Sequence, residues 1–213
     1  MRRAERGPKA ASISHRKRRT QEERRAESRA ILVEIAIQQI CVRGLAYVTM
    51  AEIADKAGMT RGAIQHHFGT RDDYIRAVLA ALTDRVVERL EHQPPSDGGS
   101  PGSLVRCCVA ELGSIVLSRE QLAVTDISLS SRSIPVLLAD SERTSRRMVE
   151  AYGAAWHRWL DGAYPGAAVG RGFDVFRFFC SGLLVNSYGH LDSTDHEDEF
   201  ALCAELVETV LAR

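Results

Sequence analysis

The side chains best suited to chemistry lie together in one short stretch. Arg61, Gly62, Gln65 and His66 stand at positions i, i+1, i+4 and i+5, a spacing that places them on one face of a helix. Arginine pairs well with guanine and glutamine with adenine, while a histidine can reach a base or a phosphate. These four residues, here called the reading face, therefore predict a helix that reads base edges in double-stranded DNA.

Two helices across a tight turn are expected to hold the reading face. Thr49 and Glu52 form a capping box that begins a helix, and Gly58 ends it. Thr60 is a second N-cap, and the second helix runs over residues 61–68. We expect Thr49 and Thr60 to donate to phosphates, beside the backbone N–H groups at the two helix starts. A small core shared by both helices would contain Ile53, Ala54, Ala57, Ile64 and Phe68. This layout is that of a helix-turn-helix.

Residues 29–76 resemble the N-terminal DNA-binding domain of the tetracycline-repressor (TetR) family of bacterial transcription regulators. The resemblance implies that His67 and Arg71 contact phosphates, although His67 could instead be a core histidine that braces the turn. The chain departs from the family at Gln65, where an aromatic residue is usual, and at Gln39, where the family has an apolar one. The matching residues are Arg43-Gly44, Thr49, Ile53-Ala54, Ala57-Gly58, Thr60-Arg61-Gly62, His67-Phe68 and Arg71.

Charge is distributed unevenly along a chain whose formal net charge is zero. Residues 1–76 hold 16 Lys and Arg against 9 Asp and Glu, whereas residues 77–213 hold 12 against 19. Residues 1–19 alone carry eight Lys and Arg and one Glu. They form either a solubilising tail or a basic arm on DNA, and we favour the arm because a helix-turn-helix needs phosphate neutralisation. The densest part contains Arg16, Lys17, Arg18 and Arg19.

The sequence lacks the common motifs of catalytic, nucleotide-binding and metal-binding proteins. It has no glycine-rich phosphate loop, no Gly-x-Ser-x-Gly and no His-Glu-x-x-His, so we expect neither an enzyme nor a cofactor. Adjacent His66 and His67 would point about 100° apart on a helix, and no metal site is expected. The five cysteines show no metal spacing; a redox role for Cys107 and Cys108 is a less favoured alternative to packing as small apolar residues.

The remaining chain is read as helical, which predicts an all-α fold. Expected helices cover residues 20–43, 70 or 72 to 91, 104–117, 120–130, 135–160, 169–188 and 197–212, with a loop at 93–103. We divide the chain into the arm (residues 1–19), a helix-turn-helix head (residues 20–76) and a body for effector binding and dimerisation (residues 77–213). No apolar run approaches 18 residues and no secretory signal is evident, so a cytoplasmic protein without a membrane partner is expected.

Two C-terminal helices are expected to form a homodimer interface. In the family they pack against the same pair of a second subunit, and two heads ~34 Å apart can then read a palindrome. The same apolar stripes could equally be intramolecular core, because periodicity does not separate the two. The stripes contain Phe173, Phe176, Cys180 and Leu183 in the first helix, and Phe200, Cys203, Val207 and Val210 in the second.

A small-molecule cavity in the body is the last feature that the resemblance implies. Effector binding there would move the long helix after the head and release a repressor from its operator. The alternative is a helical small-molecule-binding protein or enzyme whose head is vestigial. Candidate lining residues, which could also be core, are Leu112, Ile115, Val116, Tyr152, Trp156 and Phe179.

Overall fold

The computed structural model describes residues 20–92, 100–187 and 196–213. Regular structure within these residues is helical, and the one β-type pairing there is an isolated bridge between Asp161 and Tyr164. The helices are α1 (Gln21–Arg43), α2 (Met50–Lys56), α3 (Arg61–Phe68), α4 (Arg71–His92), α5 (Pro101–Val116), α6 (Arg119–Ser130), α7 (Leu138–Leu160), α8 (Gly166–Ser187) and α9 (Glu197–Leu211), with 3-10 helices η1 (Leu45–Tyr47) and η2 (Pro135–Leu137). The all-α prediction is confirmed.

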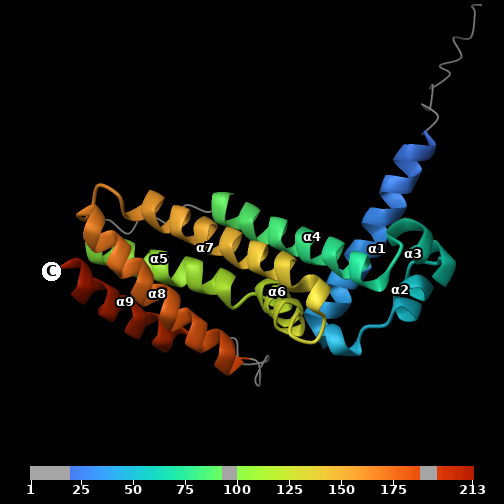
Figure 1. The fold of residues 1–213 in the computed structure, drawn as a ribbon. Coiled ribbons are helices and arrows are strands. Elements are labelled where there is room, and N and C mark those ends of the chain that lie inside the picture. The colour runs from blue at the N-terminus through green and yellow to red at the C-terminus, as the bar shows by residue number, and fades with distance from the viewer. Residues whose placement is uncertain (1–19, 93–99, 188–195) are drawn as a thin grey trace, which may run out of the picture.

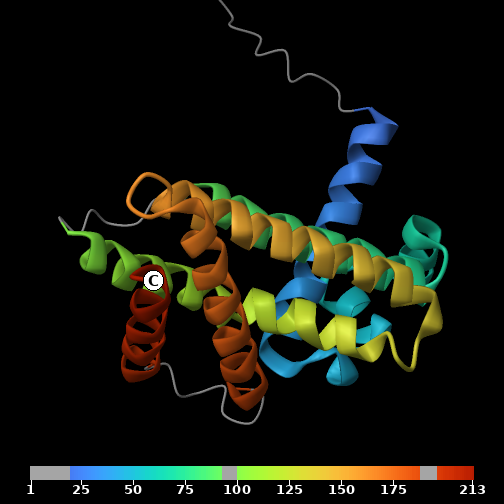
Figure 2. The ribbon, with the colours of Figure 1, turned by 60° about the vertical axis from the view of Figure 1, so that its left-hand side comes forward.

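The long helix α4 connects the head to the body. It leaves the head beside α3 and runs alongside α7, and it also packs on α1 and α6 (Figures 1 and 2). Its apolar stripe, Tyr74, Val78, Leu82 and Val86, is buried, as the helical spacing predicted. The domain boundary proposed at residues 76 and 77 falls inside this helix, so head and body share one continuous element.

Two helices begin earlier than the sequence predicted. α5 begins at Pro101 rather than near Leu104, because Ser100 accepts a hydrogen bond from the Ser103 N–H at 3.2 Å and proline fits the first helical position. α8 begins at Gly166 rather than Val169, directly after Pro165. Proline and glycine predicted a loop over residues 93–103, but a proline at a helix start loses no intrahelical hydrogen bond.

The hydrophobic core of the body is centred on Trp156. Its indole stacks on Phe176 with 5.1 Å between the ring centroids, and its Nε1 donates to the Val169 carbonyl at 3.0 Å. α5 and α9 approach each other closely at Gly113, where a Cβ atom would lie 2.4 Å from Phe200 Cε1. The position therefore admits only glycine without a shift of the ring.

No single helix in the described part of the chain is both long and apolar enough to span a membrane. The bent pair α5 and α6, whose axes differ by 54°, meets that length and composition only when the two are taken together.

Candidate functional site

Local hydrogen bonds form the helix-turn-helix as predicted. Thr49 Oγ1 accepts from the Glu52 N–H at 3.3 Å, and Glu52 Oε2 accepts from the Thr49 N–H at 3.1 Å, which completes the capping box. These bonds from Thr49, joined by one from Arg43, lower the pKa of Glu52. Gly58 turns the chain with a φ of 64°, and Thr60 then caps α3 by accepting from the Ala63 N–H at 3.3 Å.

α3 presents its polar side to solvent. All four residues of the reading face are exposed, whereas Ile64 and Phe68 on the opposite side are 2% and 7% exposed. Thr49, Thr60 and Arg71 are exposed as well. Among the described residues of the head, the candidate DNA contacts other than His67 thus lie on exposed surface.

Two arginines of α1 hold the C-terminal end of α3. Arg29 Nη1 donates to the His67 carbonyl at 2.7 Å, and Arg25 Nη2 lies 3.5 Å from the His66 carbonyl. The Arg29 guanidinium also lies 4.1 Å from the centre of the Phe68 ring. Cations at a helix C-terminus complement its dipole, so both contacts stabilise the orientation of α3. Neither contact was predicted from the sequence, although the i, i+4 spacing of Arg25 and Arg29 in α1 is a signal that could have indicated them.

His67 is partly buried at the junction of α1 and α3. Its Nδ1 is buried without a hydrogen-bond partner among the described residues, and burial, together with His66, Arg25 and Arg29, lowers its pKa. The lowered pKa favours the neutral imidazole, in which one ring nitrogen donates and the other accepts.

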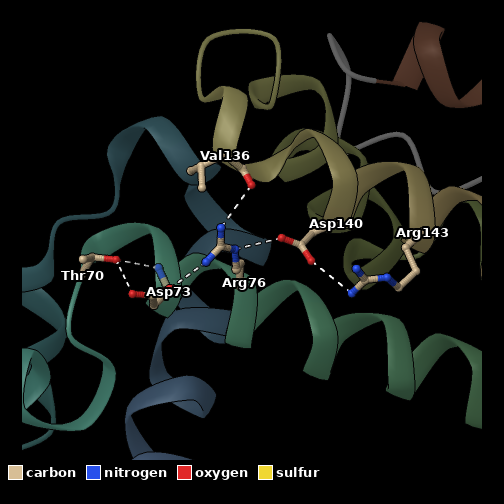
Figure 3. A network of polar contacts seen from close by, with 6 residues as sticks. All are labelled: Thr70, Asp73, Arg76, Val136, Asp140 and Arg143. Carbon is tan, nitrogen blue, oxygen red and sulfur yellow. Dashed lines mark hydrogen bonds and ion pairs between the residues drawn. The ribbon is translucent and has the colours of Figure 1, made fainter.

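Polar contacts join α4 to the start of α7 (Figure 3). Arg76 contacts Asp140 Oδ2 through Nε at 2.9 Å, Asp73 Oδ1 at 2.7 Å and the Val136 carbonyl at 3.2 Å. Thr70 caps α4 by accepting from the Asp73 N–H, and its hydroxyl donates to Asp73. The head is thereby tied to α7.

A second contact joins the head to α6. Asp126 Oδ2 accepts from the Leu45 N–H at 2.6 Å, where Leu45 is 5% exposed and belongs to η1, just before α2. A Cβ at Gly44 would lie 3.3 Å from the same oxygen. The carboxylate thus fits tightly against the backbone that leads into the helix-turn-helix.

A cavity of about 230 Å³ lies between α6, α7 and α8. Its wall is mainly apolar, with Gln121, Thr125 and Ser128 supplied by α6 and Arg177 by α8. Exposed residues at its edge, such as Val149, show that it reaches the surface.

The cavity contains only part of the predicted set of lining residues. Val116 and Tyr152 line it, whereas Leu112, Ile115 and Trp156 have no exposed surface and belong to the core. Phe179 packs against that core and does not line the cavity. Helical periodicity indicates which residues are buried. It does not distinguish residues that line a cavity from residues that fill the core, because both give the same apolar pattern.

The predicted dimer stripes of α8 and α9 face largely inward. Phe176, Cys180, Cys203 and Val207 are at most 2% exposed, so within this chain they are core. Phe173, Leu183, Phe200 and Val210 are partly buried. Large exposed apolar side chains on other faces of the same helices are Phe178, Val185, Leu202 and Leu206.

Three further expectations concern the arm, the metals and the thiols. Arg16, Lys17, Arg18 and Arg19 lie outside the described residues. Among the described residues, no group of three or more His, Cys, Asp or Glu could hold a metal ion. All five cysteines are free, and burial raises the pKa of Cys108 to about 12, which deprives it of the thiolate that redox chemistry requires.

Residues 32–78 match the family described as bacterial regulatory proteins, tetR family. The chain is 45% identical over 65 residues to the HTH-type transcriptional regulator TtgR of Pseudomonas putida, an alignment that covers 30% of each protein. The chain thus aligns with under a third of that relative's length.

The fold of most of the chain resembles solved structures at lower identity. A transcriptional regulator from Rhodococcus matches with a TM-score of 0.66 at 21% identity over 87% of this chain and 96% of that one. The multidrug binding protein EbrR, solved with imidazole, matches with a TM-score of 0.54 at 18% identity over 89% and 93%. Together, these findings place residues 32–78 in the DNA-binding region of the tetR family of bacterial regulatory proteins and show that most of the chain shares its fold with solved transcriptional regulators.

Proposed function

We propose that this regulator binds a palindromic operator as a homodimer and that a small-molecule effector in the body releases it. The observation that carries the proposal is the exposed reading face of α3, on a head that is tied to two cavity-lining helices, α6 and α7.

The reading face supplies the base contacts. Arg61 and Gln65 are exposed, and their side chains suit guanine and adenine. A Cβ at Gly62 would meet only Thr60 Oγ1, at an ordinary 3.8 Å, so packing within the head does not demand glycine there. Close approach of the α3 backbone to DNA would explain a glycine at position 62. His66 lies beside them, and Thr49, Thr60, His67 and Arg71 would hold phosphates.

Dimerisation would use the exposed apolar faces of α8 and α9. Phe178 and Val185 are 66% and 70% exposed on α8, and Leu202 and Leu206 are 51% and 45% exposed on α9. The two helices pack side by side on the part of the body far from α3 (Figures 1 and 2). A two-fold contact of this surface with itself would cover all four side chains and present two heads to one duplex.

Effector release would follow from the links between cavity and head. α6 lines the cavity at Thr125 and Ser128, and Asp126 between them binds the head at Leu45. α7 lines it at Met148 and Tyr152, and its first turns bind Arg76 of α4. A ligand that separates these helices would shift both links. To move the population from 99:1 to 1:99 it must favour the released state by about 5.5 kcal/mol. The fold likeness to EbrR, a multidrug binding protein, agrees with a ligand site in such a body.

Substitutions of the reading face test the DNA-binding part of the proposal. Arg61→Ala and Gln65→Ala should each weaken binding to a selected operator by about 1–3 kcal/mol and relax base preference at one position of each half-site. Arg171→Ala on α8 removes the same charge far from α3 and serves as the control. Unchanged operator binding by both reading-face variants would refute the assigned contacts. Deletion of residues 1–19 tests the arm: if it touches phosphates, the salt dependence of binding becomes less steep.

A further inference from the structure

The charge of the cavity wall limits the chemistry of its ligand. Among the described residues that line the cavity, Arg177 is the only one with a formal charge, and no Asp or Glu takes part. A ligand ammonium group would be desolvated there beside a like charge without a carboxylate partner. The wall therefore disfavours cations.

Arg177 can bind a ligand carboxylate at a small cost in free energy, because little is lost if its ion pair with Asp174 is broken. Its Nη2 lies 3.3 Å from Asp174 Oδ1, one turn earlier on α8, but the Asp174 side chain is 63% exposed. An ion pair so exposed to water contributes little, and a guanidinium has five N–H donors in a fork that matches a carboxylate. The guanidinium carbon of Arg177 also lies over the Phe178 ring, 4.3 Å from the ring centroid.

The opposite wall adds hydrogen-bond donors. The Tyr152 hydroxyl lies 3.4 Å from Gln121 Oε1, and burial raises the pKa of Tyr152, which therefore stays a neutral donor. With its oxygen engaged, the Gln121 carboxamide offers its NH₂ group to a ligand acceptor. The remaining wall combines apolar side chains, including Met148, Phe173 and Leu184, with four hydroxyl side chains: Thr125, Ser128, Ser145 and Ser181. A cavity of about 230 Å³ is below the common range of drug-sized sites, about 300–1,000 Å³, and suits a compact molecule.

We infer that the effector is a small apolar carboxylic acid, bound as the carboxylate with its charged group on Arg177. This inference deepens the proposed effector release and rests on the cavity being the effector site. Arg177 would then be a specificity-determining residue, because the corresponding amide or amine cannot form the charge-assisted, two-pronged contact.

Matched probe trios test the inference on the full chain without DNA. Benzoate, benzamide and benzylamine share one ring; hexanoate, hexanamide and hexylamine share one chain; and cyclohexanecarboxylate, its amide and cyclohexylmethylamine complete the set. Binding is followed by tryptophan fluorescence, because Trp156 stacks on Phe176, which lines the cavity. Calorimetry confirms each dissociation constant.

At least one acid should bind about tenfold or more tightly than its amide and its amine. Arg177→Gln should reduce that acid to the affinity of its amide, and Arg177→Lys should give an intermediate value. Arg171→Gln, on the same helix and not lining the cavity, should change nothing. Melting temperatures without ligand establish that the variants fold.

Three results would overturn the inference: amines or amides that bind as well as the acids, no saturable binding of any acid in the millimolar range, or full acid affinity in Arg177→Gln. An acid that binds through Arg177 and leaves the operator complex intact would instead refute effector release while the ligand class stands.

Discussion

Replacing Asp126 by alanine should loosen the attachment of the head to α6. The Asp126 carboxylate accepts from the Leu45 N–H at 2.6 Å, and Leu45 is 5% exposed. Alanine leaves this backbone donor without its partner, and an unsatisfied buried donor costs about 1–3 kcal/mol. Asp126→Asn keeps an acceptor oxygen but loses the charge, so its cost should be smaller. We therefore expect the free energy of unfolding to fall in the order wild type, Asp126→Asn, Asp126→Ala.

Urea denaturation measures this order directly. The midpoint should move while the denaturant dependence of the unfolding free energy stays constant, because the surface exposed on unfolding is unchanged. Glu120→Ala on the same helix removes a carboxylate from an exposed pair with Arg89, 3.7 Å away, and should cost at most about 1 kcal/mol. If Asp126→Ala unfolds at the wild-type midpoint, the Leu45 contact does not hold the head and α6 is no route from cavity to DNA.

Three other predictions concern packing, capping and assembly. Gly113→Ala places a Cβ 2.4 Å from Phe200 Cε1 and should destabilise the body by about 1–3 kcal/mol; an unchanged melting temperature would mean that the ring turns aside freely. Thr49→Ala removes the cap of α2 and should cost about 1 kcal/mol at neutral pH. Because the folded state lowers the pKa of Glu52 from 4.5, the stability from this carboxylate is present above that value and is lost as pH falls through the lowered one. The difference between wild type and Thr49→Ala should therefore shrink in acid, and a constant difference would contradict the assigned capping box. Leu206→Asp, at a side chain 45% exposed on α9, should convert a dimer to monomers in light scattering; an unchanged mass would place the interface elsewhere.

The helix-turn-helix could be predicted because its signals are local. Thr49 with Glu52 and Thr60 with Ala63 are pairs three residues apart, and each pair defines a helix start by itself. Gly58 was predicted to end α2, and it has the positive φ that is common at a glycine after a helix. Such signals need no knowledge of the rest of the fold.

The cavity and the links to the head depend on contacts between distant segments. Leu112 and Val116 stand one turn apart in α5 with the same apolar character, yet only Val116 lines the cavity. The Arg29 contact to His67 and the Asp126 contact to Leu45 span 38 and 81 residues of sequence. The sequence predicts which face of each helix is buried. It does not predict which distant residues pack against that face, because this depends on how the helices are arranged in space.

The stripes on α8 and α9 illustrate the same limit. Phe176 and Cys203 lie on the apolar face with the clearest helical period, and this face packs inside the chain. Phe178 and Leu202 interrupt that period as isolated apolar residues on the outer side. A helix that packs both in the core and against a second copy has two apolar faces. Periodicity identifies the more continuous of the two, which in α8 and α9 is the face that packs inside the chain.

Selection of bound DNA from a random pool, with the mass of the complex recorded, tests whether the chain binds a palindromic operator as a homodimer. We expect one enriched palindrome, with half-sites about one helical turn (~34 Å) or a multiple of it apart, bound by two copies of the chain. Gln65→Ala should change the preferred base at one position of each half-site. Binding that weakens with salt but enriches no sequence, or a selected site bound by one copy, would contradict this expectation.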